Sequence, residues 1–247
     1  MKRVAETDDP RRRLLIEALA LGLLSAGLPG SKLLAADLLG NRPRTLPPGQ
    51  SIYRLSGNCT VNGKEANKET RIGPSDTLHT GKDSEIIFVV GSSSMLLRGD
   101  SQVVLQSSNK GTAADTLTGM ELQKGRLLSV YAPGSHQVRT ATATIRITGT
   151  GMYIESDPER TYFCTCYGFA RISANDDPQS QDTVASKHHD RPLYILAGNK
   201  SPGKSIQAAP FVNHTDDELA IIEALVGRTV PFAHSAYDRP DLPIYNN

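Results

Sequence analysis

Residues 138–155, which read VRTATATIRITGTGMYIE, constrain the fold of this chain more than any other stretch. Apolar residues or threonines alternate with other residues along it, as in a β-strand with one buried face. Gly149-Thr150-Gly151 interrupts the alternation before residues 152–154 resume it. Glycine inside a strand marks a bulge or a sharp bend, so we predict that Gly149 and Gly151 form a structural turn that redirects the chain.

The β pattern extends over most of the chain. Short apolar or alternating segments, each bounded by turn-forming residues, lie at 51–55, 59–61, 84–90, 94–97, 103–106, 117–122, 126–131, 137–147, 152–156, 161–167 and 169–174. Many short strands at this spacing predict a mainly antiparallel β fold, either a sandwich or a barrel. Asn62-Gly63 predicts a tight hairpin, because a type I′ turn needs positive φ at both central residues. The polar residues 175–187 predict a loop.

One short helix is predicted near the C-terminus, over residues 216–226. Thr215 and Glu218 have the spacing of a capping box, in which each side chain satisfies a free backbone amide at the helix start. Gly227 follows at the position where glycine commonly ends a helix. Residues 228–247 carry three prolines and predict an extended tail.

The N-terminal 36 residues have the layout of a secretory signal. Three arginines at 11–13 precede an apolar segment that ends near residue 28, and the small residues Ala35 and Ala36 follow. The arginines and the leucines after them resemble a twin-arginine signal. We therefore expect cleavage after Ala36, a Pro- and Gly-containing linker at 37–50, and a periplasmic or otherwise exported bacterial protein. Any membrane contact would be through an uncleaved signal segment. The alternative is an amphipathic N-terminal helix of a cytoplasmic protein.

Composition and motifs argue against two broad functional classes. The net charge is +1 over 247 residues, Trp is absent and aromatic residues make up 5%, so we expect no nucleic-acid partner. Gly149-Thr150-Gly151 lacks the third glycine and the following helix of a dinucleotide-binding turn. No spacing of Ser, His and Asp marks a catalytic triad. We therefore expect a protein that is not an enzyme.

Cys164 and Cys166 are the strongest candidates for chemistry. Residues two apart on a strand project from the same face, so the two sulfurs lie together. Three interpretations are open: packing in the sandwich core, a disulfide from Cys59 to Cys164 or Cys166, or a transition-metal site. Three histidines could supply further metal ligands, or else be solvated or packed without a metal: His188, His189 and His214.

Four segments, in order along residues 50–175, resemble the FecR domain, the periplasmic module named after the ferric-citrate sensor regulator. They are 76–84 (DTLHTGKDS), 94–97 with 102–105, 122–127 (LQKGRL), and 138–140 with 144–154. The resemblance implies a jelly-roll-like sandwich. We therefore expect a FecR-like β domain at 51–175 and a C-terminal extension at 176–247. About ten residues precede the apolar run, too few for a folded domain, so we do not expect anti-sigma activity.

Two functional hypotheses follow. The first is a non-catalytic, exported FecR-like protein of the bacterial cell envelope that binds or senses a ligand, an envelope protein or a glycan. The alternative is a metal-binding envelope protein that uses the Cys164/Cys166 pair with His188, His189 or His214.

Overall fold

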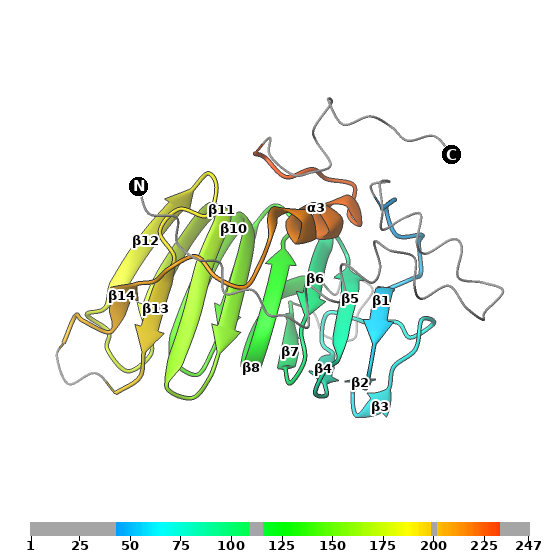
Figure 1. The fold of residues 1–247 in the computed structure, drawn as a ribbon, viewed down its shortest axis with the longest axis horizontal. Coiled ribbons are helices and arrows are strands. Elements are labelled where there is room, and N and C mark those ends of the chain that lie inside the picture. The colour runs from blue at the N-terminus through cyan, green and yellow to red at the C-terminus, as the bar shows by residue number, and fades with distance from the viewer. Residues whose placement is uncertain (1–42, 109–115, 199–201, 233–247) are drawn as a thin grey trace, which may run out of the picture.

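The computed structural model describes residues 43–108, 116–198 and 202–232. Within these ranges the fold is mainly β, with a single short helix near the C-terminus (Figure 1). The predicted signal segment, the first part of the predicted linker (37–42) and the greater part of the predicted Pro-containing tail (233–247) lie outside the described residues. No helix in the described ranges has the length and apolar character needed to cross a bilayer.

The strands form two layers. The layer that carries the helix, here called the helix-side sheet, has the order β1 (Ile52–Ser56), β5 (Glu85–Val90), β6 (Ser93–Leu97), the second half of β8 (Leu117–Val130), the second half of β10 (Ala143–Ser156), the first half of β11 (Arg160–Ala174), β13 (Leu193–Leu196) and β14 (Ile206–Ala208). All its strand pairs are antiparallel.

The other layer, here called the far sheet, contains the remaining halves of the three long strands. Its order is β3 (Lys64–Glu65), β2 (Cys59–Val61), β4 (Thr77–Thr80), β7 (Gln102–Ser107), β8, β9 (Ser135–Arg139), β10, β11 and β12 (Gln181–Ser186). The β8–β9 pair is parallel and the others are antiparallel. Since β8, β10 and β11 run through both layers, their hydrogen bonds join the two sheets into one network.

The main core lies between the two sheets and takes apolar side chains from both. Ile86, Leu97 and Ile154 represent the helix-side sheet in this core, and Val103 and Ile145 represent the far sheet. The mainly β prediction with one short C-terminal helix is confirmed, and the two layers packed on a shared core make the fold sandwich-like.

The helix-side sheet is buried on its second face as well. Alternate residues of its strands, among them Ile87, Leu128 and Tyr153, point away from the main core and form a second apolar cluster. The segment that follows β14 covers this cluster, and its helix α3 (Asp216–Ala224) packs on β6 and β8 (Figure 1). Two covered faces explain why the central strands are almost continuously buried.

The predicted bend at the glycine pair is confirmed, and the two glycines serve it differently. The pairing of β10 with β11 shifts register between Thr148 and Gly151, where β10 passes from one sheet to the other. Gly149 has a φ of 56°, in the left-handed region. At Gly151 the constraint is space, since the ring of Tyr167 occupies the place of a Cβ atom. Gly168 in β11 faces the same bend with a φ of 93°.

Two other local predictions are confirmed. Asn62 and Gly63 both have positive φ, 52° and 75°, as the hairpin between β2 and β3 requires. Helix α3 begins with the complete Thr215–Glu218 capping box. It ends at Ala224, two residues before the predicted end.

The structure corrects several strand boundaries. Each of the predicted strand pairs at 117–131 and 161–174 is one long strand, β8 or β11. The predicted strand at 137–147 divides between β9 and the start of β10, and β10 runs on through the predicted strand at 152–156. The predicted loop at 175–187 contains strand β12, whose Val184 and Ser186 are buried while Ala185 between them faces solvent. Few of its residues are apolar, which hid the alternation. The sandwich therefore continues past residue 175.

Replacing Gly168 by alanine should destabilise the fold more than the same change at Gly149. Both residues have positive φ, but a Cβ atom at Gly168 would lie 2.8 Å from the carbonyl oxygen of Gly149, whereas one at Gly149 meets nothing within 4 Å. We expect Gly168→Ala to cost about 1–3 kcal/mol more, the usual cost of overpacking. Urea denaturation of both variants measures the difference, and equal losses would contradict the proposed crowding.

Candidate metal centre

Cys164 and Cys166 lie in the first half of β11 and project from the helix-side sheet toward the C-terminal segment. The residue before them, Phe163, points into the main core, so the alternation of the strand directs both sulfurs to the opposite face. Both side chains are fully buried. Both cysteines thus pack in an apolar core, but in the second cluster beneath the C-terminal segment and not in the main core between the sheets.

Two histidines from distant parts of the chain reach these sulfurs. His189, in the loop after β12, donates its backbone N–H to the carbonyl of Cys166 at 2.8 Å. Its Nδ1 lies 3.6 Å from Sγ of Cys164. His214, just before the cap of α3, places its Nε2 at 3.0 Å from the same Nδ1. The centre thus joins a strand, a loop and the start of the helix segment.

The four side chains gather closely enough to share one ion. One ligand atom from each, the two Sγ and one nitrogen of each imidazole, lies within 4.8 Å of the others. Around a tetrahedral zinc ion with bonds of about 2.0–2.3 Å, the ligand atoms are separated by about 3.3–3.8 Å. The separations of 3.0 Å between the imidazole nitrogens and 3.6 Å between nitrogen and sulfur lie near this range, and the wider ones would close on an ion.

The far side of each imidazole has a hydrogen-bond acceptor. Nε2 of His189 lies 2.9 Å from Oδ1 of Asp216, and Nδ1 of His214 lies 2.8 Å from the carbonyl oxygen of Val212. Each of these nitrogens must carry a proton to make its bond, which fixes the tautomers. Histidines that bind a metal through one ring nitrogen usually donate the N–H of the other to a carboxylate or a backbone carbonyl, as both do here.

These tautomers leave two bare nitrogens facing each other. With the protons directed outward, Nδ1 of His189 and Nε2 of His214 present lone pairs 3.0 Å apart. Two lone pairs repel at that distance unless a cation lies between them, either a proton on Nδ1 of His189 or a metal ion. Because the sulfur of Cys164 approaches the same point, a metal ion there would engage the sulfur and both nitrogens at once.

The electrostatics of the pair of sulfurs also favour a cation. A hydrogen bond with Cys166 lowers the pKa of the Cys164 thiol; burial opposes this shift, and His189 and His214 add to it. Burial raises the pKa of the Cys166 thiol well above its ordinary value. Burial alone would lower the pKa of His189, but Cys164 and Asp216 outweigh it and the pKa is raised. The Cys164 thiolate therefore stabilises positive charge beside it, whether that charge is a proton on His189 or a metal ion.

Aromatic rings enclose the histidines. The ring of Tyr153 stacks on His214 with centroids 4.5 Å apart and planes at 17°. Phe211 packs against both His189 and His214, at 4.6 Å from each ring, and is itself 50% exposed. Phe232 covers the side of His188 at 4.2 Å. The centre is thus closed on the sheet side by Tyr153, while Phe211 separates it from solvent.

His188 does not join the four ligands. Its Nε2 lies 2.9 Å from Oδ2 of Asp216, so this carboxylate holds His188 on one oxygen and His189 on the other. The His188 side chain is 40% exposed. With His189 and Asp216 it forms a second group of potential ligands, in which Asp216 is already shared by two imidazoles. We assign His188 and Asp216 to the outer shell.

The disulfide considered from the sequence is not formed. Cys59 lies in β2 of the far sheet, buried in the main core, whereas Cys164 and Cys166 project from the opposite face of the helix-side sheet. Its Sγ donates weakly to the backbone oxygens of Ser56 and Glu85. All three cysteines are free.

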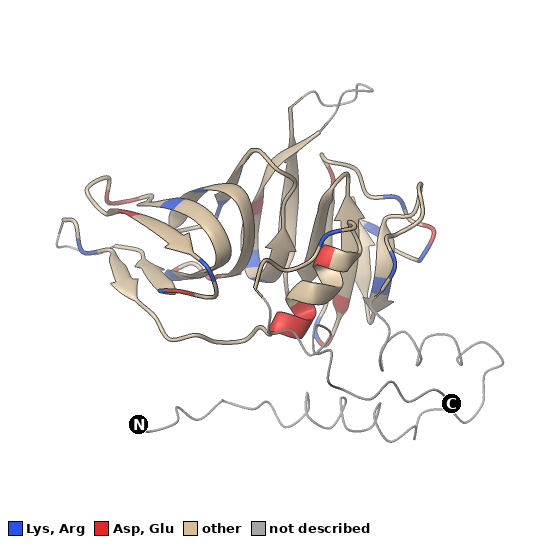
Figure 2. Ribbon diagram, turned by 90° about the horizontal axis from the view of Figure 1, so that it is seen from above, with Lys and Arg blue, Asp and Glu red and all other residues tan. Residues whose placement is uncertain are grey.

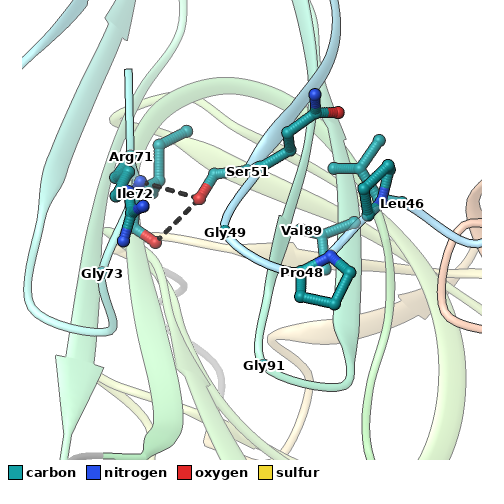
Figure 3. A pocket seen from close by; sticks show the side chains of 11 residues that line it. Leu46, Pro48, Gly49, Ser51, Arg71, Ile72, Gly73, Val89 and Gly91 are labelled. Carbon is teal, nitrogen blue, oxygen red and sulfur yellow. Dashed lines mark hydrogen bonds between the residues drawn. The ribbon is translucent and has the colours of Figure 1, made fainter. Parts of the chain in front are cut away.

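A shallow groove elsewhere on the molecule offers no comparable chemistry. It has a volume of about 480 Å³ and lies between the segment before β1 and the turn after β5 (Figure 3). Ser51 supplies the hydroxyl group of the lining. That hydroxyl already accepts from the backbone N–H of Ile72 and donates to the carbonyl of the same residue. Arg71 is the charged residue of the lining, which contains no Cys, His or carboxylate.

Comparisons with known proteins leave the family of this chain open. No protein-family model matches it, and no curated protein matches it either. Two crystal structures of a protein described as a "putative anti-sigma factor" from Parabacteroides distasonis are similar to it, with 10% identity and TM-scores of 0.42 and 0.43. Each comparison covers 55% of this chain and 60% of the other. The resemblance to the FecR domain therefore stays a prediction, and the site is argued from its own residues.

In the zinc-loaded protein, we expect the two ligand histidines to have opposite tautomers. Asp216 should keep the proton of His189 on Nε2, and the Val212 carbonyl should keep that of His214 on Nδ1. Long-range ¹H–¹⁵N correlation spectra distinguish the two nitrogens of each ring. A proton on the inner nitrogen of either ring would contradict the arrangement.

Proposed function

We propose that this protein binds one transition-metal ion, with zinc as the preferred metal, through Cys164, Cys166, His189 and His214. The observation that carries the proposal is the pair of imidazoles whose protons are directed outward by Asp216 and Val212. Their bare nitrogens and two buried sulfurs then converge within 4.8 Å.

The type and number of ligands support zinc in a non-catalytic role. Two thiolates and two imidazoles in a tetrahedral arrangement are a ligand set typical of zinc, softer than the oxygen ligands preferred by magnesium or calcium. Catalytic zinc sites leave one position open for water or substrate, whereas structural sites are closed by four protein ligands. Here four side chains fill the four positions, which favours a structural or regulatory ion.

The wider setting of the protein is also proposed and rests on the sequence. Export to the bacterial cell envelope is supported by the arginines at 11–13 and the apolar run that follows them. A ligand, an envelope protein or a glycan as the partner of the sandwich stays a prediction. Metal binding depends on neither, because every ligand lies within the described residues.

Purified protein should contain about one zinc per chain, and the double variant Cys164→Ser/Cys166→Ser should contain almost none. Serine cannot supply the thiolate on which half of the ligand set depends. Metal analysis after desalting, with cobalt(II) substitution to detect thiolate-to-metal charge transfer, measures both results. Cys59→Ser is the matched control, since Cys59 is also buried and free but lies in the main core. A folded wild-type protein that takes up no zinc would refute the proposal.

Asp216→Asn should weaken zinc binding about 10- to 100-fold, the usual effect of removing an outer-shell partner of a metal ligand. The carboxylate orients His189 through Oδ1, and an amide can present its NH₂ group there instead. Asp217→Asn is the matched control, because Asp217 is the next residue of the same helix turn and is exposed. Competition with a chelator of known affinity measures both. Equal affinities of the two variants would remove Asp216 from the centre.

A further inference from the structure

The main core of the sandwich is complete without the C-terminal segment. Its buried members come from residues 52–195, and of the described residues after them only Ile206 packs against it, partly buried. The second cluster has the opposite composition, because Leu219, Ile222 and Leu225 of the C-terminal segment supply much of its apolar surface. Removing this segment would therefore expose one face of a sheet whose other face stays packed.

Helix α3 depends on this docking for its own structure. It has nine residues, and an isolated helix shorter than about 12–15 residues is marginal in water. Its capping box and the acidic residues of its first turn, marked in Figure 2, favour the start of the helix but do not make so short a segment stable alone. The helix and its attachment to the sheet thus form together.

The ligands of the proposed metal come from both sides of this contact. Cys164, Cys166 and His189 belong to β11 and the loop bonded to it, whereas His214 immediately precedes the helix cap Thr215. Asp216, the first residue of α3, adds an outer-shell contact to the same centre. The helix cannot leave the sheet without withdrawing one ligand and one supporting carboxylate.

A second attachment holds the same turn of the helix. Arg98, at the end of β6, contacts the Glu218 carboxylate at 2.9 Å and donates to the backbone carbonyl of Asn213 at 3.0 Å. The metal ligand His214 precedes the helix cap Thr215, and the ion-pair partner Glu218 follows it. The ion pair forms with or without a metal. The contribution of the metal to docking can therefore be measured as the difference between the zinc-loaded and the chelated protein.

We propose that the metal is a clasp: its binding is coupled to the docking of the segment 209–232, and its loss releases α3 and uncovers the apolar outer face of the helix-side sheet. The proposal rests on the metal site proposed above. A ligand that binds only the docked state lowers the population of the open state by the factor 1 + [L]/Kd, and weaker binding to the open state caps this gain at the ratio of the two dissociation constants. Zinc at 100 times its dissociation constant should therefore make α3 open up to about 100-fold less often, the cap being set by the weak hold of Cys164, Cys166 and His189 alone.

Amide hydrogen exchange of the full chain tests the clasp, with the zinc dissociation constant measured independently by chelator competition. In the chelated protein, we expect the amides of α3 to exchange at least about tenfold faster than those of β4 and β7, which signals a local opening. Added zinc should slow α3 exchange about tenfold for each tenfold rise in free zinc above the dissociation constant. An apolar fluorescent dye should bind the chelated protein and be displaced by zinc.

Variants of the helix-side groups separate the clasp from simple metal binding. In the double variant His214→Ala/Asp216→Asn, both contacts from the helix segment are weakened or lost. The three remaining ligands can still hold zinc weakly, but the exchange of α3 should respond to it far less than in the wild-type protein. His79→Ala is the matched control, because His79 lies in β4 of the far sheet and should leave the response intact.

The possible outcomes distinguish failure of the clasp from failure of the metal site. Zinc bound at one per chain with unchanged α3 exchange would overturn the clasp and leave the metal site standing. Exchange of α3 at the same rate as β4 and β7 in the chelated protein would also overturn it, because the helix would then open only with the whole fold. Absence of zinc binding would overturn the metal site and the clasp together.

Discussion

The fold depends on three long strands that belong to both sheets. β8, β10 and β11 each leave one layer and enter the other, so neither sheet can be displaced without breaking backbone hydrogen bonds within a strand pair. In β10 and β11, the bend near Gly149 and Gly168 makes this passage possible at a point where the two strands approach closely. The main core is then enclosed by a continuous hydrogen-bonded network, and the helix-side sheet becomes a rigid platform for the residues on its outer face.

Only two of the four candidate ligands, the two sulfurs, lie on a strand of that platform. The sulfurs are held by β11, whose Cys164 is paired directly with Tyr153 of β10. The imidazoles come from segments with less backbone support, a loop with positive φ at His189 and the connection before α3. Hydrogen bonds to Asp216 and to the Val212 carbonyl orient the two imidazole rings, and the ring of Tyr153 stacks on His214 from the side of the sheet. A precise arrangement of donors is thus assembled from one rigid element and two adjustable ones.

Local pattern was sufficient to predict the β class, the Asn62-Gly63 hairpin, the bend and the start of the helix, because each depends on a few neighbouring residues. It could not predict which face of β11 is the core. Both faces are covered by apolar side chains, such as Phe163 on one and Tyr162 on the other, so alternation places the cysteines together without saying where. The convergence of His189 with His214 depends on how distant segments cross, which no spacing in the sequence encodes. Asp216 stands two residues after His214, but nothing in the sequence marks it as the hydrogen-bond partner of His189.

The separation of the two cysteines by one residue has a kinetic consequence. Both sulfurs lie on one paired strand, so their relative position does not depend on the loop and the segment that carry the imidazoles. In the proposed site, an incoming ion would meet this pair as a two-point receptor, and the histidines would complete the ligand set. Phe211, which is half-exposed, is the outermost group on the imidazole side, so ligand exchange would begin there. The route of entry and exit is therefore directional, with the strand as its fixed end.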